Sequence, residues 1–161
     1  MHRLLIATPI LFAFHELEEY WTALPWLRQH QSALPKFLRG VIPASADFIL
    51  IAGVLFFVVF AGVAACIIRN PQSRVFYAVF SVLVFARLEN ALGHVAQSVV
   101  FRGYTPGVLT ALLIVLPLSV VVLRDFVKSG AISTRLFAWM IPMGLIAQVL
   151  AVALLAWPEF T

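Results

Sequence analysis

Five long apolar segments follow one another along the chain, separated by short polar connections. A helix needs about 20 mostly apolar residues to cross the hydrocarbon core of a bilayer, and each segment is of this order. The apolar runs are too long for the strands of a membrane barrel and do not alternate with polar residues. The pattern therefore predicts an all-α polytopic membrane protein, a single transmembrane domain over 1–161. We expect a bundle of five transmembrane helices, at about 3–24, 45–69, 74–101, 105–123 and 134–157.

The polar connections contain residues that favour helix ends. Ser45 is expected to cap the second helix, and Asp47 in its first turn favourably meets the helix dipole. Thr105 and Pro106 indicate an N-cap followed by proline at the first position of the fourth helix. The longest connection, 25–43, is polar and contains several prolines. We expect it to be a loop or a short interfacial helix.

The composition agrees with a membrane protein. Hydrophobic residues make up 63% of the chain and charged residues 11%, whereas an average soluble domain is roughly 45–50% apolar and about 25% charged. The formal net charge is +4, but the basic residues are scattered through the connections. This argues against a nucleic-acid partner and fits loops beside a lipid bilayer. Cys66 is the only cysteine, so no internal disulfide can form.

Basic residues near the helix ends indicate an orientation. If the N-terminus is cytoplasmic, more of them lie inside than outside, as the positive-inside rule requires. The inner set is then Arg3, Arg69, Arg74, Arg124, Lys128 and Arg135, and the outer set is Arg28, Lys36, Arg39 and Arg102. The apolar N-terminal run lacks a small-x-small cleavage site, so we expect it to be retained as the first helix. We therefore expect an integral protein of a bacterial-type cell membrane with a cytoplasmic N-terminus.

One imidazole and three carboxylates interrupt the first apolar segment, at His15, Glu16, Glu18 and Glu19. In a membrane each ionised side chain costs several kcal/mol unless it is paired, hydrated or bound to a metal. On a helix His15, Glu18 and Glu19 are spaced i, i+3 and i+4 and point to one side. Glu16 is offset from His15 by about 100°. The cost of burying this cluster indicates a functional site.

A second polar stripe lies on the third predicted helix. Asn90, His94 and Gln97 are spaced i, i+4 and i+7 and share one face. Arg87 lies at the margin of this face, and Glu89 is about 100° round from Asn90. We expect Arg87 to neutralise a carboxylate of the site, to bind an anionic head group of a substrate, or to form a purely structural ion pair.

The polar residues of the first, third and fifth helices converge at one depth. These helices run in the same direction, and the residues concerned lie roughly 21–30 Å from the helix ends at 1.5 Å per residue. They are Glu18, Glu19, Asn90, His94 and Gln148. We therefore predict one polar layer beyond the midplane. Within it, the side chains of His15 and His94 should face each other closely enough to share a ligand.

Two imidazoles and several carboxylates from two helices suit a transition metal. Imidazole with carboxylate binds zinc, iron or manganese, and no thiolate lies nearby. The predicted metal ligands are His15, Glu18, Glu19 and His94. The predicted catalytic groups, which move protons or donate hydrogen bonds, are Glu18, Glu19, Glu89 and Asn90. The expected function is an integral membrane metalloenzyme that hydrolyses or oxidises a hydrophobic or lipid-like substrate.

Two other functions fit the same residues. Carboxylates held close together in a low dielectric differ in their affinity for protons, so one can donate while its neighbour accepts. Such a site would serve a metal-free isomerase, cyclase or hydrolase. A proton-coupled carrier or ion-binding protein belongs to another class; a carrier of this size would need to form a homo-oligomer, and no transporter-like repeat is visible. Additional candidates to contact a substrate are Arg87, Tyr104 and Gln148.

Three separated motifs resemble those of one known family. His15-x-x-Glu18-Glu19 is similar to the signature of the HXXEE family of small integral membrane proteins. Members of that family also carry an Asn-x-x-x-His element and a Tyr-x-Pro-Gly segment, which 90–94 and 104–107 match here. The family is functionally uncharacterised. The resemblance therefore implies which residues matter and says little about the reaction.

Overall fold

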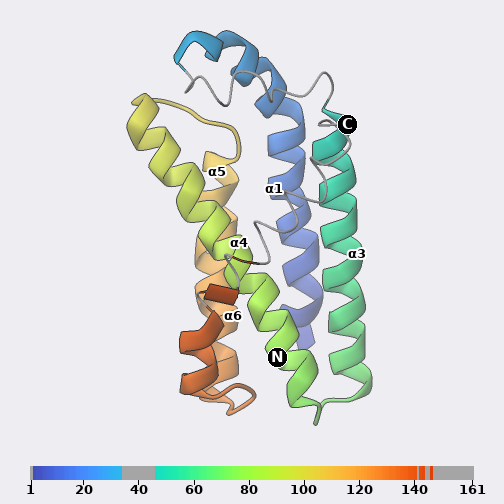
Figure 1. Ribbon diagram of the computed structural model, residues 1–161. Coiled ribbons are helices and arrows are strands. Elements are labelled where there is room, and N and C mark those ends of the chain that lie inside the picture. The colour runs from blue at the N-terminus through green and yellow to red at the C-terminus, as the bar shows by residue number, and fades with distance from the viewer. Residues whose placement is uncertain (1, 34–45, 141, 144–145, 147–161) are drawn as a thin grey trace.

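Four long helical stretches alternate in direction in the computed structural model, which describes residues 2–33, 46–140, 142–143 and 146 (Figure 1). Over these residues the chain is helical and contains no strand. The elements are α1 (His2–Gln29), a 3₁₀ turn η1 (Gln31–Ala33), α3 (Asp47–Arg69), α4 (Arg74–Phe101), α5 (Val108–Thr110), a π-helical turn η2 (Ala111–Val115) and α6 (Leu116–Lys128). The last three follow one another as one helix, Val108–Lys128. Residues 134–140 are also helical.

The observed helix ends agree with the predicted ones for α3 and α4 and differ elsewhere. α1 continues through Pro25 to Gln29, because its last turns pack on the far end of α4 and on the segment before α5. The fourth helix begins at Val108, so the predicted start at 105 is wrong. The hydroxyl of Thr105 donates to the carbonyl of His94 at 3.2 Å and caps no helix. Ser45 lies outside the described residues, and Asp47 is in the first turn of α3 as predicted.

Part of the five-span prediction is confirmed. Of the described helices, three are long and apolar enough to cross a membrane: α3, α4 and Val108–Lys128. α1 has sufficient length but carries three carboxylates within four residues, at Glu16, Glu18 and Glu19. Most of the predicted fifth helix, 134–157, lies outside the described residues.

An aromatic core joins the four stretches in one half of the bundle. Phe12 of α1 meets Phe60 of α3 edge to face, with ring centroids 5.5 Å apart. Phe60 meets Phe80 of α4 at 5.4 Å, and Phe80 meets Phe126 of α6 at 5.8 Å. Offset and edge-to-face contacts at such distances are the favoured geometry for aromatic rings. This core fixes α1 and α4 at a common height, with their polar residues further along both helices.

α1 and α4 run in the same direction and are bridged by polar side chains (Figure 1). α1 packs most extensively on α3, whereas α4 packs on α3, η2 and α6. Gly53 of α3 permits the close approach to α1, since a Cβ there would lie 2.9 Å from the Cβ of Glu16. Between α1 and α4, polar side chains of both helices make the contacts.

Candidate metal centre

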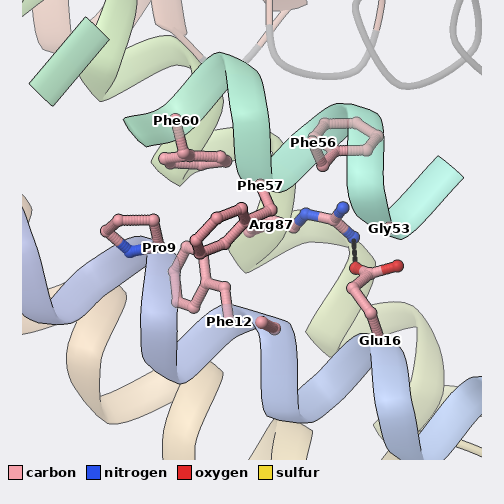
Figure 2. A pocket seen from close by; sticks show the side chains of 9 residues that line it. Pro9, Phe12, Glu16, Gly53, Phe56, Phe57, Phe60 and Arg87 are labelled. Carbon is pink, nitrogen blue, oxygen red and sulfur yellow. Dashed lines mark ion pairs between the residues drawn. The ribbon is translucent and has the colours of Figure 1, made fainter. Parts of the chain in front are cut away.

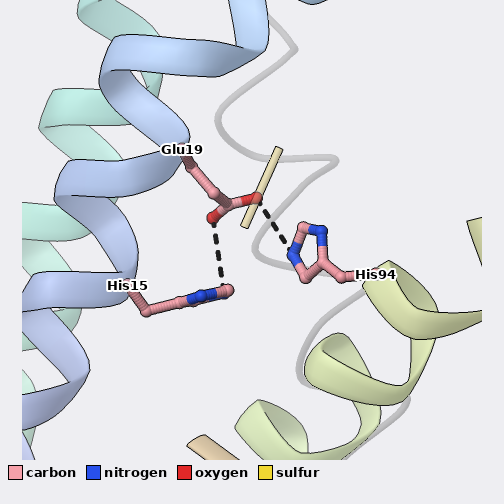
Figure 3. A group of neighbouring side chains, drawn as sticks. All are labelled: His15, Glu19 and His94. Atoms are coloured by element: carbon pink, nitrogen blue, oxygen red, sulfur yellow. Dashed lines mark ion pairs between the residues drawn. The ribbon is translucent and has the colours of Figure 1, made fainter. Parts of the chain in front are cut away.

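Two histidines and one carboxylate converge between α1 and α4. His15 and Glu19 lie one turn apart on α1, and His94 projects from α4 toward them (Figure 3). Glu19 Oε1 is 3.1 Å from His94 Nε2, and Glu19 Oε2 is 3.8 Å from His15 Nε2. The two imidazole centroids are 4.9 Å apart. The prediction that His15 and His94 face each other is thus confirmed.

This group has the composition and burial of a metal site. One ligand atom from each of the three residues can be chosen so that all lie within 4.8 Å of one another. The His15 side chain is 1% exposed, that of His94 8% and that of Glu19 21%. Two imidazoles with one carboxylate form a ligand set that zinc enzymes and non-haem iron enzymes both use. The group of His15, Glu19 and His94 could therefore hold a metal ion.

Asn90 lies between the two imidazoles. Its Nδ2 donates to His15 Nε2 at 3.2 Å and to His94 Nε2 at 3.0 Å. An amide nitrogen carries two protons and can donate to both rings only if both Nε2 atoms present lone pairs. Rotation of the amide by 180° would place its oxygen at the same point instead. Asn90 can thus either donate to the imidazoles or supply a further oxygen ligand.

A short hydrogen-bond chain fixes the tautomer of His15. Thr110 Oγ1 donates to Glu18 Oε2 at 2.5 Å and is 2.8 Å from His15 Nδ1. The acceptors around this hydroxyl, the Glu18 carboxylate and the Gly107 carbonyl, cannot donate to it. Thr110 Oγ1 must therefore accept from His15 Nδ1–H, which leaves a lone pair on His15 Nε2 toward Glu19. Such a partner on the other ring nitrogen is typical of metal-binding histidines.

Glu18 caps the N-terminus of α5. Its Oε2 accepts from the backbone N–H of Thr110 at 2.8 Å, and its Oε1 accepts from that of Leu109 at 3.3 Å. The Tyr104 hydroxyl also donates to Oε1, at 2.9 Å. These N–H groups belong to the first turn, where a helix has no internal acceptors. The structure thus places Glu18, a predicted ligand and catalytic group, beside the metal group and not within it.

Gly107 closes the site from the side of α5. Its φ of +80° lies in the left-handed region, and it precedes the first residue of α5. A Cβ at this position would lie 2.9 Å from Cε1 of His15 and 2.9 Å from Cε1 of His94. Only glycine accepts this backbone conformation readily and leaves room for both rings.

Arg87 forms a separate buried ion pair with Glu16. Its Nη1 is 2.6 Å from Glu16 Oε1, and its Cζ lies 3.8 Å from the centroid of the Phe56 ring (Figure 2). Arg87 is 7% exposed. Arg87 thus pairs with Glu16, the offset carboxylate of α1, and not with a member of the group of His15, Glu19 and His94.

Of the remaining predicted residues, the structure describes Glu89 and Tyr104, and neither belongs to the group of His15, Glu19 and His94. Glu89 is half-buried on α4, and its Oε2 has no hydrogen-bond partner in the part of the chain that the structure describes. Tyr104 reaches Glu18 and not the imidazoles. Gln148 lies outside the described residues. The shared polar layer is therefore observed for α1 and α4, and its fifth-helix member stays a prediction.

Thr110 is a contact of the site that no sequence pattern predicted, and Gly107 was indicated only as part of the family segment 104–107. Neither falls on a polar stripe of a long helix, and the turn from 105 to 107 places both. The Pro-Gly pair signals a turn in the sequence, but it does not show which helix the turn meets.

These features define a class, the helical proteins with membrane-span-like helices and a polar site inside the bundle. Within this class the chain belongs to the family described as "protein of unknown function with HXXEE motif", which matches residues 6–122. The matched segment contains His15 and His94, the two histidines of the candidate metal site, and the Glu18–Glu19 pair. The resemblance noted in the sequence is therefore confirmed. No curated protein and no solved structure matches the chain.

Proposed function

We propose that the protein is an integral membrane metalloenzyme in which His15, Glu19 and His94 hold one transition-metal ion. The convergence of two imidazole nitrogens and a carboxylate inside a largely apolar bundle carries this proposal. Three protein ligands leave coordination positions for a substrate or a water molecule, as catalytic sites require. Zinc, iron and manganese all accept this ligand set.

The hydrogen bonds around the group support a cation at its centre. His15 Nε2 presents a lone pair, because Thr110 fixes the proton on Nδ1. His94 Nε2 contacts both the Asn90 amide and the Glu19 carboxylate, at 3.0 and 3.1 Å. A neutral imidazole nitrogen cannot accept from the amide and donate to the carboxylate at once. A metal ion would satisfy the lone pairs of both rings and of Glu19 together.

The proposed substrate is hydrophobic or lipid-like and reaches the site from the bilayer. A metal ion there would activate water for hydrolysis, or dioxygen for oxidation if it is iron. Asn90 would hold a polar substrate atom by a hydrogen bond. In this proposal the protein lies in a bacterial-type cell membrane with its N-terminus cytoplasmic.

The metal content of the purified protein tests the proposal. Protein extracted in mild detergent without chelator should contain about one transition-metal ion per chain, measured by inductively coupled plasma mass spectrometry. His15→Ala, His94→Ala and Glu19→Gln should each lose most of it, since three-ligand sites do not tolerate loss of one ligand.

Two matched controls separate ligands from incidental metal binding. His2→Ala removes an exposed histidine from the same helix as His15, and Glu89→Gln removes a carboxylate from the same helix as His94. Both should keep the full metal content. Wild-type protein without stoichiometric metal would refute the proposal, as would equal metal content in His15→Ala.

The chain of Glu18, Thr110 and His15 favours one second candidate, a metal-free acid/base enzyme. This chain places the proton of His15 on Nδ1, so its Nε2 could act as the proton acceptor of a general base. In that case metal would be absent while His15 and Glu19 stayed essential for turnover. The same metal measurement therefore distinguishes the two functions.

A further inference from the structure

An apolar groove runs between α1 and α3 and has a volume of about 270 Å³. It is lined by Ala13 and Leu17 of α1 and by Leu50, Val54 and Phe57 of α3. Leu50 and Val54 are exposed, so the groove is open to the outside of the bundle. We call it the α1–α3 groove. Its volume is slightly below the range of about 300–1,000 Å³ that small-molecule sites have.

The inner end of the α1–α3 groove is polar. The groove adjoins a smaller pocket of about 10 Å³, with which it shares Glu16, Gly53 and Phe57 among its lining residues. Arg87 lines this pocket together with Phe56, and it is paired there with Glu16 (Figure 2). An apolar cavity with a few polar atoms beside it is the usual form of a site for an amphiphilic molecule.

Arg87 has a donor to spare at this inner end. Its Nη1 is paired with Glu16, and the Phe56 ring covers the face of its guanidinium. Its Nε is buried and has no hydrogen-bond partner among the described residues. A buried donor without an acceptor is costly, so a ligand that brings an acceptor to Nε would be favoured.

The charge at the inner end selects a neutral ligand. Arg87 and Glu16 together carry no net charge. A ligand with a carboxylate would therefore leave one uncompensated negative charge in a low-dielectric environment. A carbonyl or ester oxygen accepts from Nε without this cost. We propose that the α1–α3 groove binds a neutral amphiphile, with its apolar chain along α3 and a carbonyl or ester oxygen on Arg87 Nε.

This site would supply the substrate of the metal centre. Glu16 directly follows His15, so the groove and the group of His15, Glu19 and His94 lie on different faces of the same turn of α1. The assignment as a substrate rests on the proposed function, whereas the binding itself does not require a metal. Binding is therefore measured both in wild-type protein and in His15→Ala.

Photolabelling tests the groove. The probe is a fatty acid methyl ester with a diazirine on its chain, applied to the protein in nanodiscs, and the labelled peptides are mapped by mass spectrometry. An apolar groove lined by Leu11, Leu113, Ile114, Pro117, Leu118 and Val121, with a volume of about 360 Å³, contains no ionisable side chain and reports ordinary lipid contact. We expect label on α3 around 50–57 in excess over 113–121.

Two matched variants and one competition decide the outcome. Val54→Trp fills the α1–α3 groove and should abolish the excess, whereas Leu113→Trp in the other groove should leave it unchanged. Unlabelled methyl ester should compete at a concentration at least about tenfold lower than the fatty acid of equal length. Arg87→Lys keeps the charge but removes the Nε donor, so it should weaken competition by the ester. Labelling in His15→Ala should match the wild type.

The inference fails if label is spread equally over both grooves, or if ester and acid compete equally. Neither result depends on the metal, so neither would affect the measurement of metal content that tests the proposed function. Absence of metal together with selective ester labelling would preserve the binding site and refute the metalloenzyme.

Discussion

Gly107 decides at the scale of one residue whether the site can form. Its left-handed backbone turns the chain into α5, and its missing side chain leaves space for both imidazole rings. Gly130 has a similar φ of +71°, but a Cβ there would meet no atom within 4 Å. Substitution of each glycine by alanine therefore distinguishes the effect of backbone strain from that of a steric clash with the imidazole rings.

Gly107→Ala should weaken metal binding, whereas Gly130→Ala should not. Both substitutions carry the cost of an alanine in the left-handed region, about 1–2 kcal/mol, but only Gly107→Ala displaces His15 and His94. Isothermal titration of the metal-free proteins with zinc would measure this difference. Equal zinc affinity in the two variants would contradict the close packing of Gly107 on the rings.

At the scale of elements, α1 provides the cap that α5 lacks. The residue at the N-cap, Gly107, has no side chain to accept from the first turn, so the carboxylate of Glu18 does so from another helix. A negative charge at this end also favours the helix dipole. Glu18 thus ties α1 to α5 and, through Thr110, holds His15.

Glu18→Ala should loosen the start of α5. The amides of Leu109 and Thr110 would lose their acceptor, at a cost of about 1–3 kcal/mol where water cannot replace it. Hydrogen exchange followed by mass spectrometry should then be faster at 109–110. Glu89→Ala, which removes a carboxylate from α4, should leave this exchange unchanged. Unchanged exchange in Glu18→Ala would show that the cap contributes little.

At the scale of the whole molecule, the bundle has an aromatic half and a polar half. The rings of Phe12, Phe60, Phe80 and Phe126 join the four helical stretches below the polar group. Each ring gains packing contacts with its neighbours, which favour association of helices where no water is displaced. This core keeps α1 and α4 in register, so that residues distant in sequence meet in one layer.

Phe80→Ala should destabilise the bundle, and the folded fraction should keep the proposed metal. Phe80 is fully buried, and loss of such a ring typically costs about 3–5 kcal/mol. Phe14→Ala, at a side chain that is 52% exposed, should have little effect. Unfolding by titration with sodium dodecyl sulfate would compare the two. Equal midpoints would contradict the central place of Phe80 in the core.

The sequence predicted the parts of the site that follow helix periodicity. His15 and Glu19, like Asn90 and His94, are spaced by one turn and so share a face on any helix. Common direction and similar distance from the helix ends then placed both pairs at one depth. Glu18 has the same favourable spacing, yet its reach to the first turn of α5 follows from tertiary packing, which periodicity does not contain.

By itself, the sequence determined the helical class, the bounds of α3 and α4, and the pairing of the α1 stripe with the α4 stripe. These depend on local hydrophobicity and on the fixed rise of a helix. Only the tertiary structure decided that Glu16 pairs with Arg87, that Glu18 caps α5 and that Gly107 and Thr110 complete the surroundings of His15. These contacts join residues about 70 to 95 positions apart and depend on how closely three helices approach, which the packing of the whole bundle sets.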